Sequence, residues 1–206
     1  MRGRLITIEG LDGSGKTTLA DALVDALRSE GRDVVLLREP GGVELSERIR
    51  ALVKDPGLAV HPRAEALLYA AARAQLVAER VEPALAAGTW VLLDRFVDSS
   101  LAYQGVGREL GVEAVAEINH FATGGLRPDR TLLLRADAAT RAARQADRGE
   151  APDRLEREED AFFEAIAGAY DALAAAEPER FRVLEAGASP GAVLAAALGA
   201  LADVGR

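Results

Sequence analysis

Residues Gly10–Thr17 read GLDGSGKT, and this stretch decides the predicted fold. Its spacing, G-x-x-x-x-G-K-[S/T], is that of a P-loop, whose glycines allow backbone N–H groups to surround phosphate oxygens. An apolar run, Leu5–Glu9, precedes it as a predicted strand, and Lys16–Glu30 follows it as a predicted helix. A strand before and a helix after are the context that this motif requires. The sequence therefore predicts a loop that binds the phosphates of a nucleoside triphosphate.

The polar positions of the loop each have a predicted task. Lys16 is a compact positive charge that can reach the β and γ phosphates, and the helix N-terminus adds a partial positive charge. Thr17 offers a hydroxyl to Mg²⁺. The alternative is a glycine turn with an incidental lysine, but the chain contains only two lysines, which makes a coincidence harder to accept. The residues predicted to bind the nucleoside triphosphate are Gly10, Gly13, Ser14, Gly15, Lys16, Thr17 and Thr18.

The composition narrows the class of protein. The chain has 206 residues, is 49% hydrophobic and 28% charged, and carries a formal net charge of −8. Such a negative charge argues against a general nucleic-acid or acidic-membrane surface, because those partners are held by clustered positive charge. The chain has no cysteine, and no segment is apolar for long enough to predict a signal-peptide core or a membrane span. We expect a cytoplasmic enzyme with no nucleic-acid or membrane partner.

Short apolar runs alternate with longer alanine-rich segments, which is typical of a parallel sheet covered by helices. We expect a single α/β domain over residues 1–206, with a five-stranded parallel sheet flanked by helices. The predicted strands are Leu5–Glu9, Val34–Arg38, Trp90–Asp94, Thr131–Arg135 and Phe181–Glu185. The predicted helices are Lys16–Glu30, Leu45–Lys54, Arg63–Ala87, Ser99–Arg108, Val112–Ala122, Ala138–Ala146, Glu158–Ala176 and Pro190–Ala202.

A charged segment between two predicted helices differs from the rest of the chain. Residues 141–157 read RAARQADRGEAPDRLER and include a glycine and a proline. We predict that this segment is a mobile lid.

Charged side chains end two of the predicted strands. Arg38 begins REPGG at the end of the second strand, and Asp94 and Arg95 begin DRF at the end of the third. Ligands of doubly wound folds bind at this carboxyl edge of the sheet. An arginine there suits a phosphate, and an acid beside a P-loop suits Mg²⁺. The alternatives are a turn signal for REPGG and a structural salt bridge for Asp94 and Arg95.

Two pairs of side chains share helical faces further along the chain. Tyr69 and Arg73 are i, i+4 neighbours, as are Ser100 and Gln104, with Tyr103 beside the second pair. An aromatic ring with a donor, facing a hydroxyl with an amide, can sandwich a nucleobase and read its edge. Taken alone, such pairs are more often core or solvated surface.

Four motifs resemble, in their order and separation, those of the thymidylate kinase family: EGLDGSGKTT from Glu9, REPGG from Arg38, YAAAR from Tyr69 and DRFVDSSLAYQG from Asp94. The resemblance covers essentially the whole chain, and the last motif is the most specific. It implies a P-loop NTPase fold of the nucleoside monophosphate kinase type. It also implies Mg²⁺-dependent transfer of the ATP γ-phosphoryl group to dTMP in dTTP biosynthesis, a homodimer, and a cis Glu39–Pro40 bond.

The resemblance further implies residue roles on the acceptor side. Arg38 and Arg95 would bind the acceptor phosphate, and Asp12 would bind the 3′-hydroxyl while lying near enough to pair with an arginine such as Arg38. Tyr69 stands where the family usually stacks a phenylalanine on thymine, and Tyr103 would pack under the deoxyribose. Arg73 would bind a thymine carbonyl, and the remaining polar edge would be read by Ser100 and Gln104. The set predicted to bind dTMP is Asp12, Arg38, Tyr69, Arg73, Arg95, Ser100, Tyr103 and Gln104.

One branch of the family carries a catalytic arginine in the P-loop, at the position of Gly13, whereas the bacterial type supplies it from the lid. The lid here contains Arg144, Arg148 and Arg154, of which we favour Arg148 and then Arg154. Asp153 and Glu156 would anchor the lid or assist Mg²⁺, and adenine contacts are expected from the lid helix and from EAGASPG, residues 185–191. The predicted catalytic residues are Lys16, Arg95, Arg148 and Arg154, and the predicted metal ligands are Thr17 and Asp94.

Two rival functions stay open at this point. One is a different nucleoside or nucleotide kinase on the same scaffold. The other is a P-loop ATPase or switch protein, in which hydrolysis is coupled to a conformational change.

Overall fold

The computed structural model, which describes residues 2–149 and 152–204, contains the predicted five-stranded parallel sheet. The strand order is β2-β3-β1-β4-β5, so the strand that leads into the P-loop is central. The first, second, third and fifth strands have the predicted bounds, whereas the fourth strand begins one residue earlier than predicted. The bounds are β1 Leu5–Glu9, β2 Val34–Arg38, β3 Trp90–Asp94, β4 Arg130–Arg135 and β5 Phe181–Glu185.

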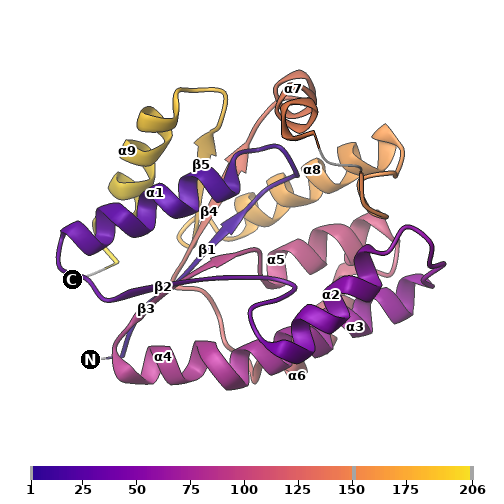
Figure 1. The fold of residues 1–206 in the computed structure, drawn as a ribbon, viewed down its shortest axis with the longest axis horizontal. Helices are drawn as coiled ribbons and strands as arrows, with labels where there is room; N and C mark the ends of the chain where they lie inside the picture. Colours follow the sequence, from indigo (N-terminus) through magenta and orange to yellow (C-terminus); the bar gives the residue numbers. More distant parts are fainter. Residues whose placement is uncertain (1, 150–151, 205–206) are drawn as a thin grey trace.

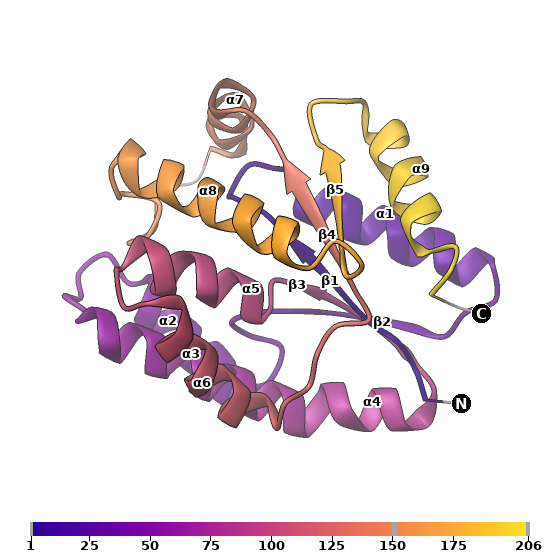
Figure 2. The same cartoon turned by 180° about the vertical axis from the view of Figure 1, so that it is seen from behind.

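Helices cover both faces of the sheet (Figures 1 and 2). On one face, α1 (Lys16–Ser29) and α9 (Pro190–Leu201) pack on alternate residues of the strands, for example Leu23 and Ala197 on Ile6 and Leu132. The other face is divided between two groups of helices. One group is α3 (Pro62–Leu76) with its continuation to α4 (Glu82–Ala87), and the other is α8 (Asp160–Ala176). Because both faces are buried, the strands read as continuous apolar runs.

The remaining α-helices of the described residues lie outside these groups. Their bounds are α2 Glu44–Lys54, α5 Val97–Ser100, α6 Val112–Thr123 and α7 Ala138–Arg148. Two of them, α2 and α6, pack on α3. The predicted helix Arg63–Ala87 is interrupted by a π-helical turn, η1 (Val77–Val81), and the predicted helix Ser99–Arg108 consists of the end of α5 and a second such turn, η2 (Leu101–Gly107). Pro83 explains the first interruption, because it lacks the N–H that an α-helix would donate to the carbonyl of Glu79. Turns of this kind are frequent at functional sites.

The register of the strands gathers the polar strand ends at one edge. Arg38 pairs with Asp94 across β2 and β3, and Asp94 in turn pairs with Ile8 on β1. The side chains predicted at the second and third strand ends therefore meet beside the P-loop. The Glu39–Pro40 bond is cis, as the resemblance implied. Among the helices of residues 2–149 and 152–204, none combines the length and the apolar character that crossing a membrane would require.

Candidate active site

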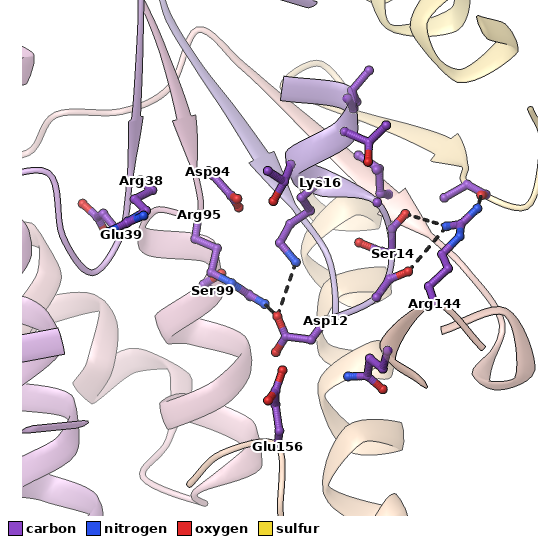
Figure 3. Close-up of a pocket in the computed structure, with 18 of the residues that line it drawn as sticks. Asp12, Ser14, Lys16, Arg38, Glu39, Asp94, Arg95, Ser99, Arg144 and Glu156 are labelled. Atoms are coloured by element: carbon purple, nitrogen blue, oxygen red, sulfur yellow. Dashed lines mark hydrogen bonds and ion pairs between the residues drawn. The ribbon is translucent and has the colours of Figure 1, made fainter. Parts of the chain in front are cut away.

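A cavity of about 520 Å³ opens at the carboxyl edge of the sheet (Figure 3). The P-loop from Asp12 to Thr18 forms one part of its wall. Residues of α3, η2 and the lid segment 141–157 form other parts. The predicted residues that line the cavity are Asp12, Gly13, Ser14, Gly15, Lys16, Thr17, Thr18, Arg38, Tyr69, Asp94, Arg95, Ser100, Tyr103 and Gln104. Residues of both predicted substrate sites thus share one cavity.

The P-loop backbone is shaped for an anion. Gly15 occupies a left-handed conformation at the N-cap of α1, and no side chain caps the helix. The first N–H groups of α1 therefore lack the side-chain cap that usually satisfies such donors. Lys16 lies folded along the loop, where its Nζ donates to the carbonyls of Gly10 and Leu11 at 3.0 Å each. A nucleotide phosphate would have to draw Nζ away from these carbonyls.

Gly13 lies directly beneath the lid segment. Its φ is 79°, and a Cβ at this position would stand 2.6 Å from the carbonyl oxygen of Arg141. An arginine at position 13 would meet both the strained backbone conformation and the backbone of α7. Position 13 therefore requires a glycine, because segment 141–157 packs against the loop at this point.

The carboxylate of Asp12 is held by Arg95 rather than by Arg38. Arg95 Nη2 donates to Asp12 Oδ1 at 2.8 Å, and Lys16 Nζ lies 3.7 Å from the same oxygen (Figure 3). Burial alone would raise the pKa of Asp12, but the charges of Arg95 and Lys16 outweigh burial and hold this pKa well below its usual range. Asp12 therefore stays ionised inside a loop that binds anions, because two cations share it. Asp12 thus pairs with one of the two arginines predicted for the acceptor phosphate, but this is Arg95 and not the suggested Arg38, which binds Glu47 at 3.0 Å.

Arg95 stands in an unusual backbone conformation. Its φ is 70°, in the left-handed region that favours glycine, and its N–H donates to the carbonyl of Ile8 at 3.0 Å. The guanidinium also donates to Ser99 at 3.1 Å and to the Tyr103 hydroxyl at 3.3 Å. Residues held in such conformations cluster at functional sites, where the surroundings fix them.

Glu9 supports this turn from inside the protein. Its carboxylate accepts hydrogen bonds from Phe96 N at 2.8 Å, Ser99 Oγ at 2.6 Å and the Tyr170 hydroxyl at 3.1 Å. Burial, with a smaller contribution from the charge of Asp98, raises the pKa of Glu9 to about 7. Glu9, the first residue of the motif EGLDGSGKTT, thus fixes the segment after Arg95 through hydrogen bonds to Phe96 and Ser99. The sequence analysis assigned no role to Glu9.

Asp94 and Thr17 could hold a metal ion. Asp94 Oδ1 is buried and has no hydrogen-bond partner among the residues that the structure describes, and both side chains line the cavity. Burying a carboxylate oxygen without a hydrogen-bond partner costs free energy of folding, unless a bound ligand supplies the missing contact. Ser14 Oγ is also buried without a partner within the described ranges. These atoms fit a magnesium ion that is shared with nucleotide phosphates.

The cavity lining includes most of the side chains predicted to bind the acceptor base and sugar. Tyr69, Ser100, Tyr103 and Gln104 all line it, but Arg73 does not. Arg73 is 1% exposed and lies behind Ser100, to which its Nη1 donates at 3.0 Å. It also donates to Glu39, Asn119 and the Phe96 carbonyl, which leaves one N–H on Nη2 without a hydrogen bond to the described residues.

The lid arginines occupy different places. Arg144 Nη1 donates to the Ser14 carbonyl at 3.1 Å, and its Nη2 donates to the Ala186 carbonyl at 2.7 Å (Figure 3). It therefore joins the P-loop to the turn after β5. Arg154 does not line the cavity; its guanidinium binds Glu65 at 2.6 Å and the Val53 carbonyl at 2.8 Å. The side chain of Arg148, the favoured candidate, lies outside the described part of the chain.

Several polar side chains of the cavity were not predicted. Arg50 and Lys54 on α2 line it, and Lys54 Nζ binds Asp153 of the lid segment at 2.8 Å. Their i, i+4 spacing on an amphipathic helix after REPGG was the available signal. Glu156, which was predicted together with Asp153 to anchor the lid or assist Mg²⁺, also lines the cavity and lies beneath Asp12 in Figure 3.

The P-loop follows the central strand, aromatic, hydroxyl and amide side chains line the same cavity, and segment 141–157 packs on the loop. These are the features of a P-loop kinase. A family profile described as thymidylate kinase matches residues 8–196. Three similar curated proteins are each described as thymidylate kinase. The protein from Alkalilimnicola ehrlichii is 50% identical over 205 residues, which cover 98% of this chain and 94% of the relative. The protein from Oenococcus oeni is 51% identical over 194 residues, covering 92% and 90%. The protein from Rhizorhabdus wittichii is 48% identical over 207 residues, covering 99% of each.

The chain belongs to the thymidylate kinase family. It is a phosphotransferase of nucleotide biosynthesis, and the resemblance drawn from the four motifs is confirmed.

The raised pKa of Glu9 predicts how stability depends on pH. The folded state keeps this proton up to about pH 7, whereas the unfolded chain loses it near 4.5. Protonation of Glu9 therefore contributes stability that is complete below about pH 4.5 and is lost as the pH rises through about 7. Between about pH 5 and about pH 8, the unfolding free energy of the wild type should therefore fall by up to about 3 kcal/mol more than that of Glu9→Gln, which cannot ionise at position 9.

Urea unfolding of both proteins across this pH range measures the difference. Glu44→Gln, on the exposed face of α2, is the control and should follow the wild type. A difference that stays constant from about pH 5 to about pH 8 would mean that Glu9 is ionised in the folded protein across this range, as it is in the unfolded chain.

Proposed function

We propose that this chain transfers the γ-phosphoryl group of ATP to dTMP, giving dTDP and ADP, in the synthesis of dTTP. The observation that carries the proposal is that one cavity is lined both by a P-loop and by aromatic, hydroxyl and amide side chains suited to a nucleobase. A hydrolase or switch would need only the first of these. The relatives described as thymidylate kinase support the choice of acceptor.

In this proposal the acceptor nucleotide occupies the end of the cavity near α3 and η2. Its phosphate is bound by Arg38 and Arg95, and its 3′-hydroxyl by Asp12. Tyr69 stacks on the base, and Tyr103 packs against the deoxyribose, which excludes a 2′-hydroxyl sterically. Arg38 must exchange its bond to Glu47 for the phosphate, and a surface pair of this kind is weak enough to exchange. The base edge is assigned to Arg73, Ser100 and Gln104, with Arg73 using its one N–H that has no partner among the described residues.

The donor nucleotide occupies the P-loop end. Backbone N–H groups of residues 13–18 and Lys16 bind its β and γ phosphates. Asp94 and Thr17 would hold Mg²⁺ together with phosphate oxygens, and the ion would neutralise phosphate charge there. Arg144 borders this end and bonds to the turn after β5, so we place adenine beside it.

The transfer requires no covalent intermediate and no general base. A phosphate monoester is largely dianionic at pH 7, so an oxygen of the acceptor phosphate can attack the γ phosphorus directly. The bond from the γ phosphorus to the β–γ bridging oxygen breaks, and ADP leaves with the electron pair. Catalysis then consists of aligning the two phosphates and compensating their charge. Lys16 and Arg95 both line the cavity and both contact Asp12, and we assign Lys16 to the donor phosphates and Arg95 to the acceptor phosphate.

The segment 141–157 acts as the lid of a single domain spanning residues 1–206. Arg148 remains our first candidate for the arginine that compensates charge on the transferred group, with Arg154 second. Because Arg154 is bound to Glu65, it would have to leave that partner to act, whereas Arg144 already contacts the P-loop. We therefore add Arg144 as a donor-binding residue.

We also infer a homodimer from the resemblance, and a cytoplasmic location as the composition led us to expect. Phe121 on α6 is 90% exposed and Leu67 on α3 is 57% exposed, and these two helices pack together. A second copy of the chain would remove this apolar surface from water.

A panel of acceptors tests the proposed function. ADP release, coupled to a second enzyme, should be fastest with dTMP among dTMP, dCMP, CMP and free thymidine. ATP hydrolysis without an acceptor should be negligible. Fastest turnover of free thymidine would assign a nucleoside kinase instead, and an acceptor-independent rate equal to the full rate would assign an ATPase.

Three alanine variants separate the lid arginines. Arg148→Ala should lower kcat by about 100-fold with little change in the KM for dTMP, because charge compensation acts in the transition state. Arg144→Ala should instead raise the KM for ATP, since its contacts are with the donor loop. An unchanged kcat in Arg148→Ala would rule Arg148 out, and a fall in kcat in Arg154→Ala would move the role there.

A further inference from the structure

A buried carboxylate, Glu65, lies at the start of α3 and contacts three side chains from distant parts of the chain. It is 0% exposed, and it accepts hydrogen bonds from Gln104 Nε2 at 2.8 Å, Arg108 Nη2 at 3.2 Å and Arg154 Nη2 at 2.6 Å. Gln104 belongs to the cavity lining, whereas Glu65 does not. We propose that Glu65 is a positioning residue that sets base specificity by fixing which end of the Gln104 amide faces the acceptor. This inference rests on the proposed function.

The orientation of the Gln104 amide follows from the chemistry of its neighbour. An ionised carboxylate can only accept hydrogen bonds, so the NH₂ end of the amide must face Glu65. The opposite end, Oε1, accepts no hydrogen bond from the residues that the structure describes. Gln104 is 2% exposed, and the surface that it keeps lines the cavity. Its Oε1 is therefore available to accept a hydrogen bond from the ligand.

An acceptor at this place recognises one feature of thymine. When thymine is linked to deoxyribose through N1, its only ring N–H is at N3. An acceptor that reads the base by a conventional hydrogen bond must therefore read N3–H. Uracil carries the same donor, whereas the unprotonated N3 of cytosine is an acceptor. A Gln104 amide turned the other way would present two donors to N3–H and would leave both groups unsatisfied.

Two arginines donate to the carboxylate of Glu65 beside Gln104. Arg108, which also binds Glu158 at 2.7 Å, approaches from the end of η2, and Arg154 approaches from the lid segment. A buried carboxylate needs such partners, because burying an unpaired charge is costly. Glu65 also stands one helical turn before Tyr69, so α3 carries both the proposed stacking ring and the group that orients the amide.

The test compares dTMP with dCMP, whose cytosine has an unprotonated N3 in place of N3–H. For the wild type, kcat/KM should be about tenfold or more higher with dTMP, the discrimination typical of a good hydrogen-bonded contact. In Glu65→Gln this ratio should fall by about tenfold, because the Gln104 amide can then turn and offer its NH₂ to N3 of cytosine, while the KM for ATP changes little. Gln104→Met should lower the ratio equally, and adding Glu65→Gln to it should change the ratio no further.

Two further variants keep the test decisive. Glu158→Gln removes the other carboxylate partner of Arg108 without touching Gln104, and it should keep the wild-type ratio. Glu65→Asp keeps the charge but withdraws it from Gln104, so it should lose the ratio even if Glu65→Gln fails to fold. A wild-type ratio in Glu65→Asp, or in a folded Glu65→Gln, would overturn the inference while leaving dTMP phosphorylation intact. A wild type that does not phosphorylate dTMP would overturn the proposed function itself.

Discussion

The ion pair between Asp12 and Arg95 joins the two halves of the cavity. Asp12 belongs to the loop that would bind the donor phosphates, and Arg95 follows the strand that leads to the acceptor residues. Their 2.8 Å contact places a carboxylate between two cations, which explains how a loop built for anions tolerates it. Without Arg95, the carboxylate of Asp12 would repel the phosphates on both sides.

The conformation of Arg95 depends in turn on buried groups. A left-handed φ of 70° is unfavourable for arginine and persists only where its surroundings fix it. Here the Ile8 carbonyl binds the Arg95 N–H, and Glu9 binds the next N–H along the chain, that of Phe96. Both come from β1, directly before the P-loop. The central strand therefore positions the P-loop and Arg95 together, and in the proposed function this common origin would keep the two substrates aligned.

The sequence predicted the sheet well because each strand is buried on both faces and reads as an apolar run between breakers. Helix limits were less accurate where Pro83 and the glycines of η2 change the hydrogen-bonding pattern. The P-loop and the DRF motif carry their chemistry in local spacing, so their residues could be placed. Pairings between distant residues could not. Arg95 lies 83 positions from Asp12, and no pattern distinguishes it from Arg38 as a partner. Glu65 and Arg144 belong to no motif, and their positions depend on tertiary packing alone.

The coupling between Asp12 and Arg95 is tested most directly by a double-mutant cycle on kcat/KM for dTMP. The variants are Asp12→Asn, Arg95→Lys and the double substitution, with the KM for ATP measured in each. If the pair acts as one unit, the double variant should lose little more than the worse single variant, with a coupling energy of about 1.5 kcal/mol or more. The KM for ATP should change little. Losses that simply add, or a loss of ATP binding with dTMP kinetics intact, would contradict this account.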